Sequence, residues 1–193
     1  ILNVASASLD KIKANQELSD LVLALGCGSG VHYSEEALRY EKVIIMTDAD
    51  VDGAHIASLL MTFFYQEMPD LIRQGHLYLA RPPLYRITIS NHTYYAQDDK
   101  EKDEVIAKNK KGNSRVEVGR FKGLGEMTPP QLKETTMHPG NRVLLQVRIE
   151  DDEFESTGKR VDELMGKKPE FRFQFITEQT ANRGSALLEE LDV

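Results

Sequence analysis

The feature that most constrains the fold is an apolar run, a helical pattern and a second apolar run, all within residues 42–80. Residues 42–47 form a short stretch rich in Val and Ile, which is typical of a strand buried on both faces. Residues 54–64 repeat apolar side chains at helical spacing, and residues 76–80 (HLYLA) predict a second strand. Because strands joined by a helix usually lie parallel, this order predicts an α/β fold with a parallel sheet.

Three aspartates, Asp48, Asp50 and Asp52, alternate at the end of the first predicted strand. In a parallel α/β sheet, ligands bind at the carboxyl ends of the strands. Side chains two residues apart point the same way while the backbone is extended, so these carboxylates favour a hard divalent cation such as Mg²⁺ as counter-ion. A metal there would stabilise charge during phosphoryl transfer. The alternative for Asp52 is a simple helix N-cap.

Two other kinds of site share part of this pattern. The spacing D-x-D-x-D-G matches the start of an EF-hand loop, but its twelfth position is Leu59 instead of Glu, and a strand precedes it. A strand followed by D-x-D also resembles the haloacid-dehalogenase phosphatases, whose motif has Thr or Val where this chain has Asp52. Hydrolysis of a phosphate ester therefore stays an alternative function.

Residues outside this unit predict a mixture of helices and short strands. Thr128, a following proline and Gln131 predict a helix start, with Thr as N-cap and Gln three residues later. The alternating Phe residues at the start of 169–176 fit a strand, but their spacing fits a helix too, and we favour the helix. The other expected elements are helices at 8–25, 35–40, 68–73, 98–108 and 161–165, a hairpin at 85–96, and strands at 115–121 and 142–149.

Charge and cysteine content restrict the class of protein. The formal net charge of −7 argues against nucleic-acid binding driven by global charge, although it leaves room for a local basic surface. Lys122 lies beside two glycines in the run RFKGLGEM, where small residues let backbone approach a phosphate. The single cysteine, Cys27, cannot form an internal disulfide, and no run approaches the roughly 18 apolar residues of a membrane span. We expect a cytoplasmic protein that uses no membrane.

Three segments, in this order, resemble the B subunit of the bacterial type IIA DNA topoisomerases. Residues 39–87, with VIIMTDADVDGAHIASLL, resemble the metal-binding half of its Toprim domain. Residues 119–151, opening GRFKGLGEMTPPQL, resemble the tail that follows, and residues 164–176 (LMGKKPEFRFQFI) resemble the family's carboxyl-terminal segment. The short connection up to residue 119 and the run GKKPEFRF are more similar to the topoisomerase IV branch than to the gyrase branch.

This resemblance implies a Rossmann-like Toprim parallel sheet flanked by helices at residues 1–97 and a mixed α+β tail at 98–193. It implies an ATP-dependent enzyme that cleaves, passes and reseals double-stranded DNA, as topoisomerase IV does in decatenation and relaxation, with the gyrase B subunit as the alternative. The partners would be duplex DNA and a second kind of subunit that carries the attacking tyrosine, in an A2B2 assembly associated with the nucleoid. Mg²⁺ would be the cofactor, with Mn²⁺ or Ca²⁺ as substitutes, and ATP would bind outside this segment.

By the same resemblance, Asp48 and Asp50 are the catalytic, metal-ligating carboxylates, and Asp52 is an auxiliary metal ligand. Another Toprim enzyme, such as a primase or nuclease, and a non-catalytic interaction module remain alternatives. The four residues below are expected to contact DNA, with ordinary packing or capping as the alternative for each. They are Asn3, His55, Lys122 and Arg142.

Two departures from the family pattern shape the expectations for this chain alone. The family's glutamate, in an E-G-D-S-A motif on the first Toprim strand, is expected upstream of Ile1. We therefore expect the segment by itself to be inactive, to bind metal weakly and to expose a sheet edge prone to association. His138 stands where the family has Asp, far along the sequence from the aspartate cluster.

Overall fold

A computed structural model describes residues 1–150 and 153–183 of the chain. Its first sheet has the strand order β1-β2-β6, built from β1 (Val43–Ile45), β2 (Leu77–Arg81) and β6 (Val143–Gln146). β1 and β2 are parallel, as the strand–helix–strand pattern predicts, whereas β6 pairs antiparallel with β2. The expected parallel sheet is therefore a mixed one, because a strand from the tail joins it.

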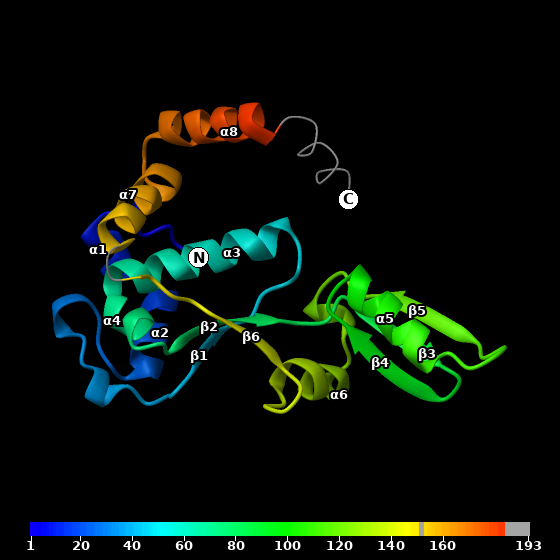
Figure 1. The fold of residues 1–193 in the computed structure, drawn as a ribbon. Helices are drawn as coiled ribbons and strands as arrows, with labels where there is room; N and C mark the ends of the chain where they lie inside the picture. Colours follow the sequence, from blue (N-terminus) through cyan, green and yellow to red (C-terminus); the bar gives the residue numbers. More distant parts are fainter. Residues whose placement is uncertain (151–152, 184–193) are drawn as a thin grey trace.

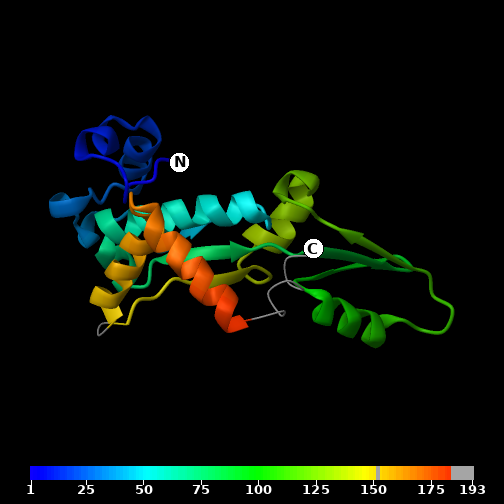
Figure 2. The same ribbon diagram turned by 90° about the horizontal axis from the view of Figure 1, so that it is seen from above.

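The connection from β1 to β2 consists of α3 (Val51–Glu67) and the short α4 (Pro69–Arg73). In both views α3 runs alongside β2 (Figures 1 and 2). The helix turns large apolar side chains towards the sheet, and Phe63, Phe64 and Leu77 are almost completely buried. This burial is the main favourable term that holds the helix on the sheet.

The N-terminal region adds a helical layer to the same core. The single helix expected at 8–25 is two helices, α1 (Leu9–Ala14) and α2 (Gln16–Leu25). Asn15 divides them, because its side chain accepts a hydrogen bond from the Leu18 backbone N–H at 3.0 Å and so caps α2. Short 3₁₀ turns follow, η1 (Gly30–His32) and η2 (Glu35–Ala37).

A second sheet has the order β4-β3-β5, from β3 (Tyr85–Ile89), β4 (His92–Ala96) and β5 (Val116–Arg120). It lies at the far end of an elongated molecule, covered by α5 (Asp99–Asn109) (Figure 1). The predicted hairpin is confirmed by antiparallel pairing of β3 and β4. This sheet combines strands from before and after residue 97, since β3 pairs with β5. The expected domain boundary at that residue stays a prediction.

From β5 the chain returns to the first sheet through η3 (Leu124–Glu126), α6 (Pro129–Leu132) and the π-helical turn η4 (Lys133–Met137). The predicted start of α6 is confirmed, since the Thr128 backbone N–H donates to Gln131 Oε1 at 2.9 Å. His138 closes the following turn by accepting the Gly140 N–H on Nδ1 at 3.1 Å.

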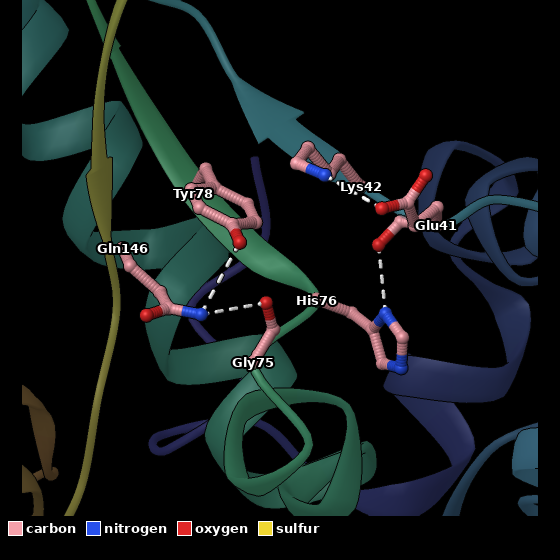
Figure 3. Close-up of polar contacts among 6 residues, drawn as sticks. All are labelled: Glu41, Lys42, Gly75, His76, Tyr78 and Gln146. Atoms are coloured by element: carbon pink, nitrogen blue, oxygen red, sulfur yellow. Dashed lines mark hydrogen bonds and ion pairs between the residues drawn. The ribbon is translucent and has the colours of Figure 1, made fainter.

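Polar contacts connect β2 and the turn before it with β6, the strand that comes back from the second sheet (Figure 3). Gln146 of β6 donates from Nε2 to the Gly75 carbonyl at 2.9 Å and to the Tyr78 hydroxyl at 3.2 Å. On the other side of the strand, His76 Nδ1 lies 2.7 Å from the Glu41 carbonyl. These contacts join the α4–β2 turn to β6 and to the segment just before β1.

The tail ends in two helices, α7 (Phe154–Met165) and α8 (Pro169–Arg183), which meet at a sharp turn above α3 (Figures 1 and 2). The preference for a helix over a strand at residues 169–176 is confirmed. In the part of the chain that the structure describes, no helix is long and apolar enough to cross a membrane.

The Tyr33 hydroxyl is the exception to good polar pairing in the N-terminal core. It is buried and makes no hydrogen bond with any residue that the structure describes. Burial, with smaller contributions from the neighbouring Cys27, Glu35 and Asp70, raises the pKa of this hydroxyl to about 12. A buried donor without a partner costs stability.

Tyr33→Phe is therefore expected to raise the free energy of unfolding by about 1 kcal/mol at neutral pH. The pKa of the Tyr33 hydroxyl in the folded state lies above the ordinary value of about 10, so the native state favours the protonated hydroxyl. As the pH rises from about 10 to about 12, the unfolded state loses this proton more readily, and the parent protein loses stability. The advantage of the variant should then widen above pH ~10. Urea denaturation across this range measures it, and a variant less stable than the parent at pH 7 would contradict the argument.

Candidate metal centre

The aspartate cluster lies in the loop between β1 and α3, at the carboxyl end of the first sheet. Asp50 is the N-cap of α3, and its Oδ1 accepts the Gly53 backbone N–H at 2.7 Å. The capping role considered for Asp52 thus belongs to Asp50. Asp52 lies exposed in the first turn of the helix, where the helix dipole favours a negative charge.

Gly53 brings the start of α3 into direct contact with the backbone of Asp48. A Cβ atom at this position would lie 2.0 Å from the Asp48 carbonyl oxygen, far inside any allowed contact. The glycine is also buried. Only a residue without a side chain lets the helix begin here, so Gly53 sets the distance between the two metal-ligand candidates, Asp48 and Asp50.

A loop from the distant tail contacts the exposed Asp48 side chain. The Leu124 backbone N–H donates to Asp48 Oδ1 at 2.7 Å, and a Cβ on Gly123 would lie 2.8 Å from the Asp48 carboxyl carbon. The backbone of Gly123 is extended, so space and not backbone conformation demands glycine there. The structure places the first glycine of the run RFKGLGEM against this carboxylate, and the expected approach of the run to a phosphate stays a prediction.

These side chains fit part of a magnesium site. Within residues 1–150 and 153–183, the hydrogen bonds to Asp48 and Asp50 engage only one oxygen of each carboxylate. Both residues are exposed at the sheet edge. Mg²⁺ is often held by one or two carboxylates, with phosphate oxygens and waters completing its shell, and this pair suits that arrangement.

The third aspartate does not complete the group. Among the described residues, no three His, Cys, Asp or Glu side chains lie close enough together to hold one metal ion. Asp48, Asp50 and Asp52 therefore do not converge on a single point, since α3 begins between them. Their assignment as metal ligands stays a prediction.

Two of the expected DNA contacts, Lys122 and Arg142, lie on the same side of the molecule as Asp48. Lys122 directly precedes the glycine that touches the Asp48 carboxylate, and its side chain is exposed. Arg142 directly precedes β6, whose first residue, Val143, pairs with Arg81 at the carboxyl end of β2. Since β1 and β2 run parallel, this end of the sheet is the one from which Asp48 follows.

The other two, Asn3 and His55, line a different hollow. Together with the turn between α7 and α8 they border a groove of about 450 Å³. His55 is exposed on α3, whereas Asn3 uses both ends of its amide, donating to the Met165 carbonyl at 2.9 Å and accepting the Ala5 N–H at 3.2 Å. The expectation that these residues contact DNA stays a prediction, and the structure adds a packing role for Asn3.

Comparison with known proteins identifies two families along the chain. The Toprim domain family matches residues 2–82, and the family described as the DNA gyrase B subunit, carboxyl terminus, matches residues 113–177. The B subunit of DNA topoisomerase 4 from Rickettsia felis is 62% identical over all of this chain, which covers 29% of that protein. The corresponding protein of Caulobacter vibrioides is 61% identical over 92% of the chain and 25% of its own length. The DNA gyrase B subunit of Thermotoga maritima is 46% identical over the whole chain and 29% of its own length.

The chain belongs to the family of type IIA topoisomerase B subunits. Within that family it is more similar to the proteins named as B subunits of DNA topoisomerase 4 than to the gyrase B subunit of Thermotoga. It spans less than a third of the length of these relatives and carries the Toprim domain with the region that follows it. The fold class and the family expected from the sequence are thereby confirmed.

Sequence reasoning missed two features of this region. It did not connect the second glycine-rich motif with Asp48, because no local pattern reports a contact between residues 76 positions apart. It also did not include Lys167 and Arg172, which border the same groove as His55. The basic run GKKPEFR was the available signal, and it served only to mark the family.

Proposed function

We propose that this chain is the Mg²⁺-binding part of a type II topoisomerase that cleaves, passes and reseals duplex DNA, in the manner of topoisomerase IV. The relatives that cover the chain carry the names of such B subunits. The observation that carries the proposal is the Asp48 carboxylate, held at the carboxyl end of β1 by the Leu124 backbone N–H. Fixing one oxygen in this way orients the other for a metal ion.

In this proposal Asp48 and Asp50 hold Mg²⁺, and Asp52 contributes negative charge from the first turn of α3. The ion supplies stabilisation of charge on the phosphate and the leaving oxygen during strand cleavage. Lys122 and Arg142 contact the DNA backbone beside this site, and Asn3 and His55 contact it in the neighbouring groove. The attacking tyrosine comes from the partner subunit, and ATP binds elsewhere in the full-length protein, which works on the nucleoid.

The test reconstitutes the reaction with the full-length protein, the tyrosine-bearing partner and supercoiled plasmid. After incubation with Mg²⁺, a detergent quench should trap linear DNA covalently attached to protein, and chelation of the metal before the quench should prevent it. Mn²⁺ or Ca²⁺ in place of Mg²⁺ should also support trapping.

The proposal is wrong if binding of the partner is confirmed and no linear DNA forms with any of the three ions. Release of phosphate from a small phosphate ester by the same preparation would then favour the haloacid-dehalogenase alternative. A catenated DNA substrate, in the presence of ATP, measures decatenation and separates the topoisomerase IV activity from that of gyrase, which supercoils.

A further inference from the structure

The loop of residues 121–127 connects the second sheet to the aspartate site, and it is fixed at both ends. At its start the Phe121 N–H donates to the Leu84 carbonyl at 2.8 Å. At its end Met127 is buried, with only 7% of its surface exposed. Both residues border a small cavity of about 10 Å³ together with Ala49, which lies between the first two aspartates. The two ends of the loop therefore have set positions beside the site.

The middle of this loop has few contacts of its own to hold its conformation. Gly123 and Gly125 have no side chains to pack, and glycine loses more conformational freedom on folding than any other residue. Gly125 is exposed, and a Cβ there would meet nothing within 4 Å. Another residue is therefore needed to keep this backbone in one conformation.

Glu126 supplies that restraint. Its Oε2 accepts the Lys122 backbone N–H at 2.8 Å, and its own N–H donates to the Gly123 carbonyl at 3.2 Å. A carboxylate makes a stronger hydrogen bond with a backbone N–H than a neutral acceptor does. The two contacts close a turn that runs from Lys122 to Glu126 and has Leu124 at its centre.

This turn directs the Leu124 N–H at the metal-ligand candidate. The N–H donates to Asp48 Oδ1 at 2.7 Å, although Asp48 is exposed and water competes for the same oxygen. A backbone that is already fixed in the right place loses less entropy when it makes such a bond. Removal of the Glu126 carboxylate should therefore weaken the hold on Asp48 without changing Asp48 itself.

Two other roles for Glu126 have less support. As a metal ligand it would have to join Asp48 and Asp50, but within residues 1–150 and 153–183 no three His, Cys, Asp or Glu side chains lie close enough together to hold one ion. As a simple surface charge it would not need the backbone contact that its Oε2 makes.

We propose that Glu126 is a positioning residue of the metal site, whose carboxylate keeps the loop closed so that the Leu124 N–H stays on Asp48. This inference rests on the function proposed above. Glu126 acts through the backbone of its own loop and touches neither the metal nor the DNA. Its role depends on an acceptor oxygen at this position and not on the negative charge, which distinguishes it from a metal ligand.

The test measures trapped linear DNA against Mg²⁺ concentration, with the full-length protein, its tyrosine-bearing partner and supercoiled plasmid. Glu126→Ala should raise the Mg²⁺ concentration for half-maximal cleavage about 3- to 10-fold, which is the scale of losing one hydrogen bond. The yield at saturating Mg²⁺ should stay close to that of the parent protein, because the metal ligands remain. Glu126→Gln keeps an acceptor oxygen and should restore most of the parent's response to Mg²⁺.

Hydrogen exchange of the same samples, without metal, reports on the loop directly. Peptides that contain residues 122–127 should exchange faster in Glu126→Ala than in the parent protein, and at the parent rate in Glu126→Gln. The melting temperature checks that each variant is folded. Glu134→Ala is the matched control, because it also removes an exposed carboxylate from the tail. Among the described residues, only the backbone carbonyl of Glu134 accepts a side-chain hydrogen bond, from Asn141.

The inference is wrong if Glu126→Ala needs no more Mg²⁺ than Glu134→Ala does. It is also wrong if Glu126→Gln loses as much as Glu126→Ala, since the charge of Glu126 would then act on the metal. Failure of the proposed function looks different, because the parent protein itself would trap no DNA with Mg²⁺, Mn²⁺ or Ca²⁺ while still binding its partner. The proposed catalysis would then be wrong, and the exchange rates alone would decide whether Glu126 positions the Leu124 N–H.

Discussion

Asp48→Asn in the full-length protein is expected to reduce Mg²⁺-dependent DNA cleavage about 100-fold or more, which is the scale of losing one group that stabilises transition-state charge. The substitution removes the negative charge and keeps the shape of the side chain. Its amide oxygen can still accept the Leu124 N–H that now binds Asp48 Oδ1 at 2.7 Å. The loop from the tail therefore stays in place, and the loss reports the missing metal ligand.

Asp50→Asn should have a similar effect on cleavage, since an asparagine caps a helix as well as an aspartate and leaves the start of α3 intact. Asp50→Ala removes the cap too and should also lower the stability by about 1 kcal/mol. The measurement is the yield of covalently trapped linear DNA against Mg²⁺ concentration, with thermal unfolding as the check on folding. Asp52→Asn is the comparison, with a smaller loss expected because this residue lies on the helix.

Full cleavage by Asp48→Asn and Asp50→Asn at the Mg²⁺ concentration that the parent protein needs would contradict the assignment. A loss that disappears at much higher Mg²⁺ would instead fit weakened metal affinity, which the same titration reveals. DNA binding without metal should be unchanged or slightly stronger in both variants, because each removes a negative charge close to where the proposed function places the DNA backbone.

Gly53→Ala is expected to abolish cleavage and to destabilise the fold by about 3 kcal/mol, at the upper end of overpacking effects. The new Cβ would lie 2.0 Å from the Asp48 carbonyl oxygen and 2.9 Å from its carbonyl carbon. Both are backbone atoms just after β1, a partly buried strand, and they cannot rotate away as a side chain could. The first turn of α3 has to move instead, and Asp50 moves with it.

Gly125→Ala is the control for this variant. It lies in the loop that contacts Asp48, but a Cβ there would meet nothing within 4 Å. We expect wild-type cleavage and an unchanged melting temperature for Gly125→Ala. Gly53→Ala should lower the melting temperature by about 6 to 12 °C for a chain of this size. If Gly53→Ala melts and cleaves like the parent protein, the close approach of α3 to Asp48 is wrong.

Local chemistry made much of the secondary structure predictable. The short run of Val and Ile before the aspartates indicates β1, and the capping pair Thr128 and Gln131 marks the start of α6. In each case the deciding interactions lie within a few residues of one another, so a sequence pattern carries them. The prediction of one helix at 8–25 was wrong in one respect, because Asn15 caps a second helix and so divides the segment in two.

Contacts between distant segments could not be predicted in this way. β6 pairs antiparallel with β2, with Val143 opposite Arg81, and the Asn3 amide donates to the Met165 carbonyl at the α7–α8 turn. Neither contact produces a periodic pattern in the sequence, because each depends on how the whole core packs. Sequence patterns report the faces of an element and not the element that will cover them.

The sequence alone predicted a cluster of carboxylates directly after an apolar strand. Residue type and hydrophobic period are local properties, so a pattern of neighbouring residues is enough to identify them. The family could be recognised from the same letters. Only the tertiary structure placed the Gly123–Leu124 backbone on Asp48 and the α7–α8 turn beside His55. These contacts join segments that are far apart in the sequence. They are decided by how the whole core packs, and no local pattern of residues reports that packing.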